Sequence, residues 1–88
     1  MLQYKLFNFG KLNGTIYDFP EINDILPKHD HDETNVHITV VARGKFKAVG
    51  DGWEKELSSG DVVDWQPHQP HEFISLEPNS RIVNIIKA

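Results

Sequence analysis

The chain contains no cysteine, which excludes disulfide bonds and thiolate metal sites. It has few cations: 9 lysine and arginine residues stand against 13 acidic ones, and the formal net charge is −4. A nucleic-acid partner is therefore not expected, because phosphate binding needs a basic face. The absence of cysteine fits a reducing compartment, so a cytoplasmic location is expected.

Long hydrophobic runs are also missing. No segment approaches the ~18 consecutive apolar residues of a membrane span, so no membrane association is expected, and the first residues lack the apolar core of a signal peptide. Nucleophilic catalysis has no support, because cysteine and a Gly-x-Ser-x-Gly motif are both absent. A Gly-rich phosphate loop is absent as well. With 88 residues, the chain is expected to form one domain, residues 1–88.

Short runs rich in Val, Ile, Phe and Trp alternate with dense turn signals, a pattern typical of an all-β sandwich or barrel. No stretch sustains helical spacing over three turns. A turn is predicted at Asn13-Gly14, and residues 21–26 remain open between a helical turn and a short strand. The strands expected from this pattern cover residues 2–9, 15–19, 36–42, 45–49, 53–57, 62–65, 71–76 and 81–87.

The strand predicted from residue 36 carries apolar residues on both of its faces. Alternation places His37, Thr39 and Val41 on one face and Ile38, Val40 and Ala42 on the other. The last strand shows the same mixture. A second copy packed on the sheet would cover the face that the core of the chain leaves open. A homodimer is therefore predicted as the alternative to a monomer.

The five histidines fall into two clusters, one at residues 29–37 and the other at 68–71. Residues two apart in a strand project to the same face, so His29 and His31 can converge on one point. His37 belongs to the next strand, and His71 begins a later one. Three or four neutral imidazoles inside a small barrel would form a divalent-metal site. The alternative is a polar, solvated loop, since His-x-His alone is a weak signal.

The first cluster resembles the first motif of the cupin family. That motif is His-x-His, a short loop, a glutamate, six residues and a glycine. Residues 29–44 read HDHDETNVHITVVARG, with His29 and His31, then His37 at the glutamate position and Gly44 after six residues. The loop before His37 has five residues, where the family usually has three or four. A rival register therefore remains, in which Glu33 is a ligand and His29 is not.

The second cluster resembles the second cupin motif, which is Gly, five residues, Pro-x-Gly, two residues and His. Residues 60–71 read GDVVDWQPHQPH, beginning at Gly60 and ending at His71. The fifteen residues between Gly44 and Gly60 match the short spacing between the motifs of compact cupins. The resemblance implies a small jelly-roll barrel, or double-stranded β-helix, with one metal ion inside. The ligands that it implies are His29, His31, His37 and His71.

Several positions depart from the family pattern. His68 replaces the second-motif glycine and is expected in a bend, pointing outward. Asn23 stands where a glycine is expected six residues before His29, and Ser75 replaces an asparagine. Arg81 is interpreted either as a charged strand end or as a ligand for a substrate carboxylate. Trp53 and Trp65 are expected to pack in the core or to stack on a ligand.

Imidazole ligands suit a borderline divalent ion, so Fe, Ni or Zn is expected. The first functional hypothesis is a metal-dependent oxygenase or isomerase acting on a small polar molecule. The alternative is a non-catalytic sugar- or metabolite-binding module with a structural metal or none, and whether the chain is an enzyme stays open. A third hypothesis is a 2-oxoglutarate-dependent oxygenase that uses His31, Glu33, His71 and Arg81.

Overall fold

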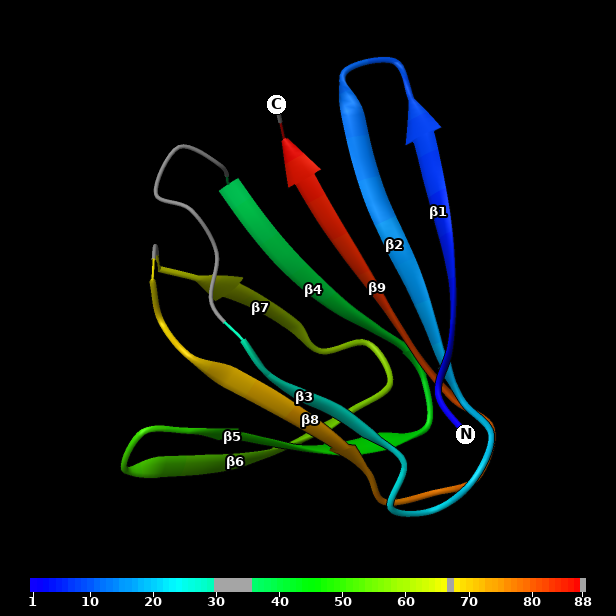
Figure 1. Ribbon diagram of the computed structural model, residues 1–88, viewed down its shortest axis with the longest axis vertical. Coiled ribbons are helices and arrows are strands. Elements are labelled where there is room, and N and C mark those ends of the chain that lie inside the picture. The colour runs from blue at the N-terminus through cyan, green and yellow to red at the C-terminus, as the bar shows by residue number, and fades with distance from the viewer. Residues whose placement is uncertain (30–35, 67, 88) are drawn as a thin grey trace.

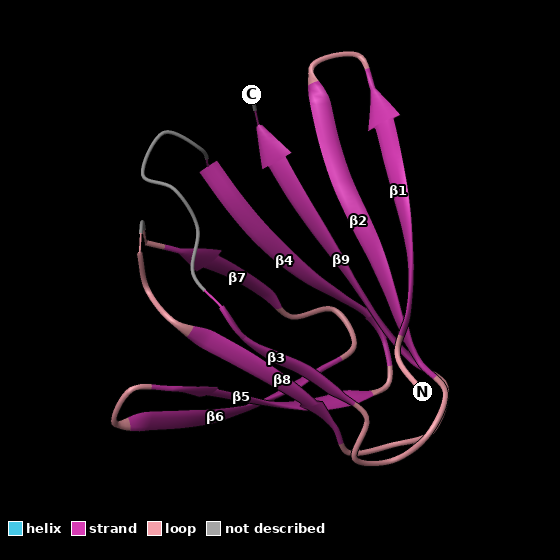
Figure 2. Ribbon diagram, viewed as in Figure 1, coloured by secondary structure: helices cyan, strands magenta, loops and turns pink. Residues whose placement is uncertain are grey.

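The computed structural model describes residues 1–29, 36–66 and 68–87, and every regular element in these ranges is a β-strand (Figure 2). Accordingly, no helix in this part of the chain has the length and apolar character needed to cross a bilayer. The predicted all-β class is confirmed. The strands are β1 (Gln3–Phe9), β2 (Leu12–Phe19), β3 (Ile25–His29), β4 (Val36–Arg43), β5 (Lys45–Gly50), β6 (Trp53–Ser58), β7 (Val62–Trp65), β8 (His71–Ser75) and β9 (Ser80–Lys87).

The strands form two antiparallel sheets, and the chain passes back and forth between them. The larger sheet has the order β1-β2-β9-β4-β7, and the smaller has the order β3-β8-β5-β6. Figure 1 shows the larger sheet as a fan above the smaller one, with the chain crossing between them near the N-terminus. The predicted hairpin across residues 50–52 is confirmed, with Gly50 and Trp53 as its closing pair. Two sheets of this kind are the layers of a jelly roll.

The turn predicted at Asn13-Gly14 is wrong. The chain turns at residues 10–11 instead, and Gly14 lies inside β2, paired with Phe7 of β1. A Cβ atom on Gly14 would clash with the Phe7 ring and with the carbonyl oxygen of Asn84. Glycine therefore stands here to let an aromatic ring and a neighbouring strand approach closely. Sequence alone does not separate this use of glycine from a turn.

The two motif glycines both have left-handed backbones, with φ of +85° at Gly44 and +94° at Gly60. A side chain at Gly44 would also clash with Ser80. The turns that contain them contact each other, since the N–H of Ser59 donates to the carbonyl oxygen of Gly44 at 3.1 Å and the N–H of Gly60 donates to Val41 at 2.9 Å. These contacts connect β4 with the turn that leads into β7. The left-handed backbone at both positions explains why the motif has glycine there.

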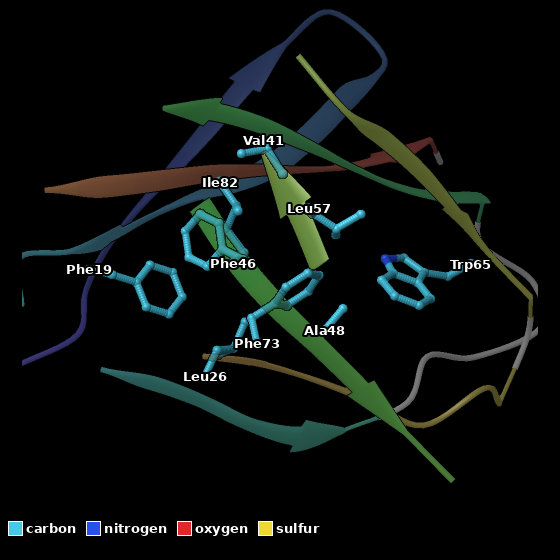
Figure 3. Close-up of a cluster of buried hydrophobic side chains, with 9 residues drawn as sticks. All are labelled: Phe19, Leu26, Val41, Phe46, Ala48, Leu57, Trp65, Phe73 and Ile82. Carbon is cyan, nitrogen blue, oxygen red and sulfur yellow. The ribbon is translucent and has the colours of Figure 1, made fainter. Parts of the chain in front are cut away.

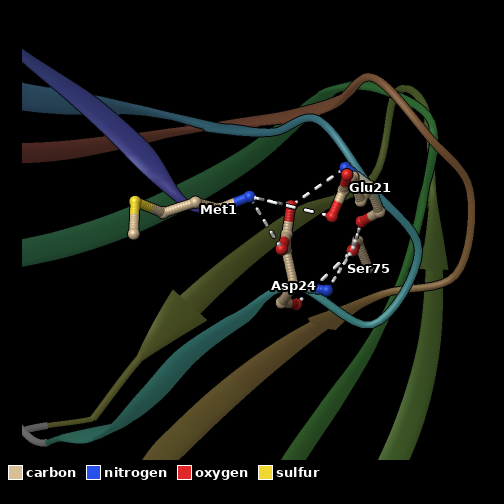
Figure 4. A network of polar contacts seen from close by, with 4 residues as sticks. All are labelled: Met1, Glu21, Asp24 and Ser75. Carbon is tan, nitrogen blue, oxygen red and sulfur yellow. Dashed lines mark hydrogen bonds and ion pairs between the residues drawn. The ribbon is translucent and has the colours of Figure 1, made fainter.

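Residues 21–24, left open by the sequence, form a turn that leads into β3 (Figure 4). The Asp24 carboxylate accepts the Glu21 N–H at 2.9 Å. The Ser75 hydroxyl donates to the Glu21 carbonyl oxygen at 2.6 Å and accepts the Asp24 N–H at 3.0 Å. The Met1 ammonium lies 3.2 Å from the Asp24 carboxylate. Ser75, at the family's asparagine position, therefore ties the start of β3 to the end of β8.

Replacing Asp24 with asparagine is expected to lower stability in a pH-dependent way. The hydrogen bond from the Glu21 N–H lowers the pKa of Asp24; burial opposes this, and the Met1 ammonium lowers the pKa further. A carboxylate with a depressed pKa stabilises the fold above its unfolded pKa and stops doing so as pH falls through the folded value. The difference between wild type and Asp24→Asn should therefore shrink below about pH 4.

Urea unfolding measured across pH tests this expectation. Glu77→Gln, which removes an exposed carboxylate at another turn, is the control and should change stability little at any pH. A difference in unfolding free energy between wild type and Asp24→Asn that stays constant as the pH falls below about 4 would contradict the assigned role of the carboxylate.

The hydrophobic core lies between the two sheets (Figure 3). Phe46 contacts Phe19 edge-on, with ring centroids 4.7 Å apart, and Phe73 at 6.2 Å. Figure 3 shows Phe19 and Trp65 at opposite ends of the cluster. Buried polar side chains, among them His37, Thr39 and His71, lie at the Trp65 end of the core. The nine apolar members are Phe19, Leu26, Val41, Phe46, Ala48, Leu57, Trp65, Phe73 and Ile82.

Candidate metal centre

Three histidines from three strands meet at the Trp65 end of the core. The ring centroid of His71 lies 4.4 Å from that of His29 and 5.7 Å from that of His37. His37 and His71 are 1% and 0% exposed, so neither is a surface histidine, and His29 is half-buried. His37 comes from the larger sheet and the other two from the smaller one. The cluster therefore bridges the two layers.

A β-bulge directs His29 to this cluster. Leu26 pairs with Phe73 and His29 pairs with His71, so three steps along β3 correspond to two along β8. Side chains alternate along a strand, and regular alternation from Leu26 would put Lys28 on the inner face. The extra residue in the bulge moves His29 to the inner face instead.

The histidines of the smaller sheet are oriented by backbone carbonyl groups. The Nδ1 atom of His29 lies 2.8 Å from the carbonyl oxygen of Pro27, and that of His71 lies 2.8 Å from that of Gln69. A carbonyl oxygen only accepts, so Nδ1 carries the proton, and the lone pair of the neutral ring is on Nε2. Metal-binding histidines have this same second hydrogen bond, which sets the tautomer and the ring orientation.

Trp65 forms one wall of the cluster. Its indole ring stacks on His71 with centroids 4.0 Å apart and an angle of 8°. The indole N–H donates to the Thr39 hydroxyl at 2.8 Å, and that hydroxyl donates to the Asn84 side-chain oxygen at 2.6 Å. This buried chain of hydrogen bonds crosses β7, β4 and β9 and holds the indole against His71. In the sequence, the one signal for Asn84 is a polar residue in an otherwise apolar alternation.

The structure brings together three of the four predicted ligands, namely His29, His37 and His71. His31 and its rival Glu33 lie outside the described residues. Within residues 1–29, 36–66 and 68–87, no group of three or more His, Asp or Glu side chains is arranged to hold a metal ion. The imidazoles present are suitable donors for Fe, Ni or Zn, and the complete ligand set, including His31, stays a prediction.

Solved structures with a similar arrangement of strands include cupins. An RmlC-like cupin protein from Desulfovibrio desulfuricans aligns with a TM-score of 0.85 at 20% identity, over 98% of this chain and 81% of that chain. KdgF from Halomonas sp. aligns with a TM-score of 0.83 at 25% identity, over 98% of this chain and 79% of that chain. The chain has the cupin fold.

A cupin 2 conserved barrel domain protein from Salinispora arenicola extends the likeness, with a TM-score of 0.82 at 16% identity over 99% of this chain and 76% of that one. No protein-family model and no curated protein matches the sequence. The jelly-roll prediction is thus confirmed by structure, while the low identity leaves the activity of the protein to be argued from its site.

Two departures from the cupin motifs are explained by backbone geometry. His68 and Asn23 stand at expected glycine positions, and their φ angles are +56° and +70°. Both residues therefore adopt the left-handed conformation that glycine adopts without strain, and asparagine tolerates it better than most residues. His68 is exposed in a turn, as expected.

Replacing His68 with glycine is expected to stabilise the protein by roughly 0.5 to 1 kcal/mol, because the left-handed conformation strains a residue that has a Cβ atom. Thermal or urea unfolding measures the change. His68→Ala keeps the Cβ atom and serves as the control. Equal effects of the two substitutions would show that strain at this position is not the cause.

Arg81 pairs with Asp18 instead of facing the histidines. Its guanidinium donates to both carboxylate oxygens of Asp18, at 2.7 and 3.2 Å. The next residue, Ile82, is fully buried, so Arg81 lies on the outer face of β9. This position supports the interpretation of Arg81 as a charged strand end. The 2-oxoglutarate hypothesis, which used Arg81 to bind the substrate, therefore lacks that arginine.

Proposed function

We propose that this cupin binds one divalent metal ion, Fe, Ni or Zn, and acts as a metal-dependent oxygenase or isomerase on a small polar molecule. The ligands in this proposal are His29, His31, His37 and His71. The observation that supports it best is the pair of Nδ1 hydrogen bonds to backbone carbonyl groups. These bonds select the tautomer in which Nε2 is the coordinating atom.

A bound divalent ion would supply Lewis-acid polarisation of a substrate oxygen. The residues of the chain would provide the setting. Trp65 covers one face of His71 and excludes water from that side. His37 is buried, so charges near it are weakly screened. Because the imidazole groups are neutral, the positive charge of the ion would stay uncompensated by the protein. The site would therefore favour a bound molecule that offers an oxygen donor.

The alternative is a non-catalytic module that binds a sugar or another metabolite and holds a structural metal or none. It is favoured by the lack of a three-donor metal group within the described part of the chain. The short chain also leaves few loops to enclose a substrate.

Elemental analysis of protein purified without a histidine tag tests the proposal. About one equivalent of Fe, Ni or Zn per chain is expected, or uptake of one equivalent after addition of these ions. Oxygen consumption and proton-exchange assays over thiols, phenols and keto acids then separate an enzyme from a binding module. Protein that neither contains nor takes up these metals would exclude the metal-dependent reading.

The outer face of the larger sheet bears on the predicted homodimer, because it carries two adjacent apolar rows. The first row begins with the exposed Lys5 at the β1 edge, and the second ends with the exposed Asp64 at the β7 edge. Strand pairing places Ile16, Val83, Val40 and Val62 in the first row and Phe7, Ile85 and Ile38 in the second. Two adjacent rows of apolar side chains are unusual on a sheet face that is exposed to solvent.

We infer that a second copy of the chain packs on this outer face. A two-fold axis parallel to the strands places β1 of one copy over β7 of the other. The edge that carries Lys5 then faces the edge that carries Asp64, and this occurs twice by symmetry. The face is therefore complementary to itself in charge as well as in hydrophobicity.

The Ile85→Asp variant is expected to be monomeric, because it puts a charge at the centre of this face. Sedimentation or light scattering on wild type and variant measures the change. Ile74→Asp, an equal change on the outer face of β8, is the control and should leave the dimer intact. A wild-type protein that remains monomeric at all concentrations would contradict the inferred interface.

A further inference from the structure

A groove of about 340 Å³ lies between β6 and β7, the facing edge strands of the two sheets. Its described lining includes Trp53 and Trp65 but none of the clustered histidines. β6 and β7 follow each other in the chain, joined by the turn that contains Gly60. The groove is therefore a hollow separate from the histidine cluster, with which it shares the Trp65 indole.

The aromatic part of the lining is held in place before any ligand binds. The Trp53 and Trp65 rings are stacked, with centroids 6.1 Å apart and an angle of 29°. Trp53 packs on Gly50, where a Cβ atom would clash with the indole. Trp65 is held by Thr39 and His71. Rigid aromatic surfaces bind a ligand with little loss of conformational entropy.

The polar part of the lining comes from Lys55, Asp64 and Gln69. The formal charges of Lys55 and Asp64 cancel, so the lining favours a neutral ligand over an ion. The Gln69 side-chain oxygen accepts the N–H of Gln66 at 3.0 Å, which leaves its amide N–H groups as the donors on that side chain. The groove thus offers an ammonium group and an amide beside an apolar wall, with Asp64 at its β7 edge.

We propose that this groove binds the ring of a neutral monosaccharide. A pyranose has apolar C–H faces and a rim of hydroxyl groups that both donate and accept hydrogen bonds. Its C–H face would lie on Trp53, and its hydroxyls would reach Lys55 and Gln69. The hollow has room for one such ring. Because the described lining contains none of the clustered histidines, the proposal does not depend on a bound metal.

The two tryptophans of the chain give a direct readout, since both line the groove. Their indole N–H signals are followed by two-dimensional nitrogen–proton NMR while D-glucose, D-galactose or D-mannose is added. A saturable shift of both signals is expected with at least one of these sugars, in metal-loaded and in chelator-treated protein alike. Glycerol controls for a general effect of hydroxyl groups, and benzoate for a general effect of flat rings.

Variants locate the binding. Trp53→Ala is expected to weaken sugar binding about tenfold. Lys55→Ala, an exposed position whose loss leaves the core intact, should weaken it about threefold or more. Lys47→Ala is the matched control, because Lys47 pairs with Glu54 at 3.1 Å outside the groove, and its affinity should be unchanged.

Three outcomes would overturn the proposal. They are no saturable shift with any of the three sugars, tighter binding of benzoate than of every sugar, and unchanged affinity in both Trp53→Ala and Lys55→Ala. Loss of sugar binding in chelator-treated protein would instead indicate that the sugar binds at the metal centre, and it would also reject the proposal that the groove is the binding site.

Discussion

The His37→Ala variant is expected to lose bound metal, with an affinity at least ~100-fold below that of wild type. His37 is the one clustered histidine, among those described, that comes from the larger sheet. Without it, the described donors all belong to the smaller sheet, and the ion loses its contact with the opposite wall. The proposed enzymatic activity should disappear with the metal, because the donor set would no longer enclose it.

Competition with a chelator, followed by elemental analysis, measures this loss. His68→Ala is the matched control, since it also removes an imidazole but from an exposed turn. It should leave metal affinity unchanged. The pair His29→Ala and Glu33→Ala decides between the two ligand registers: the variant that loses metal identifies the ligand. Unaltered metal content in His37→Ala would refute the proposed centre.

The Phe73→Ala variant is expected to lose about 3 to 5 kcal/mol of unfolding free energy. Phe73 is 0% exposed and lies between Phe46 and Trp65, with ring centroids 6.2 and 5.8 Å away. Its ring is also 6.0 Å from His71. Removing the ring leaves a cavity that β8 cannot close without moving His71, so both the packing and the edge-to-face aromatic contacts are lost.

A domain of this size has roughly 4 to 13 kcal/mol of stability in total, so the loss is a large share of it. The expected fall in Tm is roughly 15 to 30 °C, measured by thermal unfolding. Phe9→Ala is the control, because Phe9 is 80% exposed and its removal should cost less than about 0.5 kcal/mol. Similar losses in the two variants would contradict the assigned core.

Much of the fold follows from local patterns, and these were predictable. Alternation in residues 36–42 placed His37 on the same face as Thr39 and Val41, and all three are buried. The turn at residues 50–52 was predictable as well. The expected bend at His68 has a left-handed backbone. In each case the determining contacts lie within a few residues of one another, so a single stretch of sequence contains the information.

The turn at Asn13-Gly14 shows where this reasoning fails. An Asn-Gly pair favours a hairpin turn locally, but Gly14 is required inside β2 by the Phe7 ring and by Asn84, which is 70 residues away in the chain. The need for glycine at position 14 comes from neighbouring strands, so local turn propensity cannot predict it.

The sequence by itself determined an all-β chain with two cupin-like motifs and a strand in which His37 shares a face with Thr39 and Val41. Tertiary structure alone decided how the site is assembled. The bulge that turns His29 inward depends on the register between β3 and β8, and the Trp65–Thr39–Asn84 chain depends on three strands far apart in sequence. The groove between β6 and β7 exists because those strands are the edges of different sheets. Strand register and sheet order are set by packing over the whole core, so residue spacing cannot specify them.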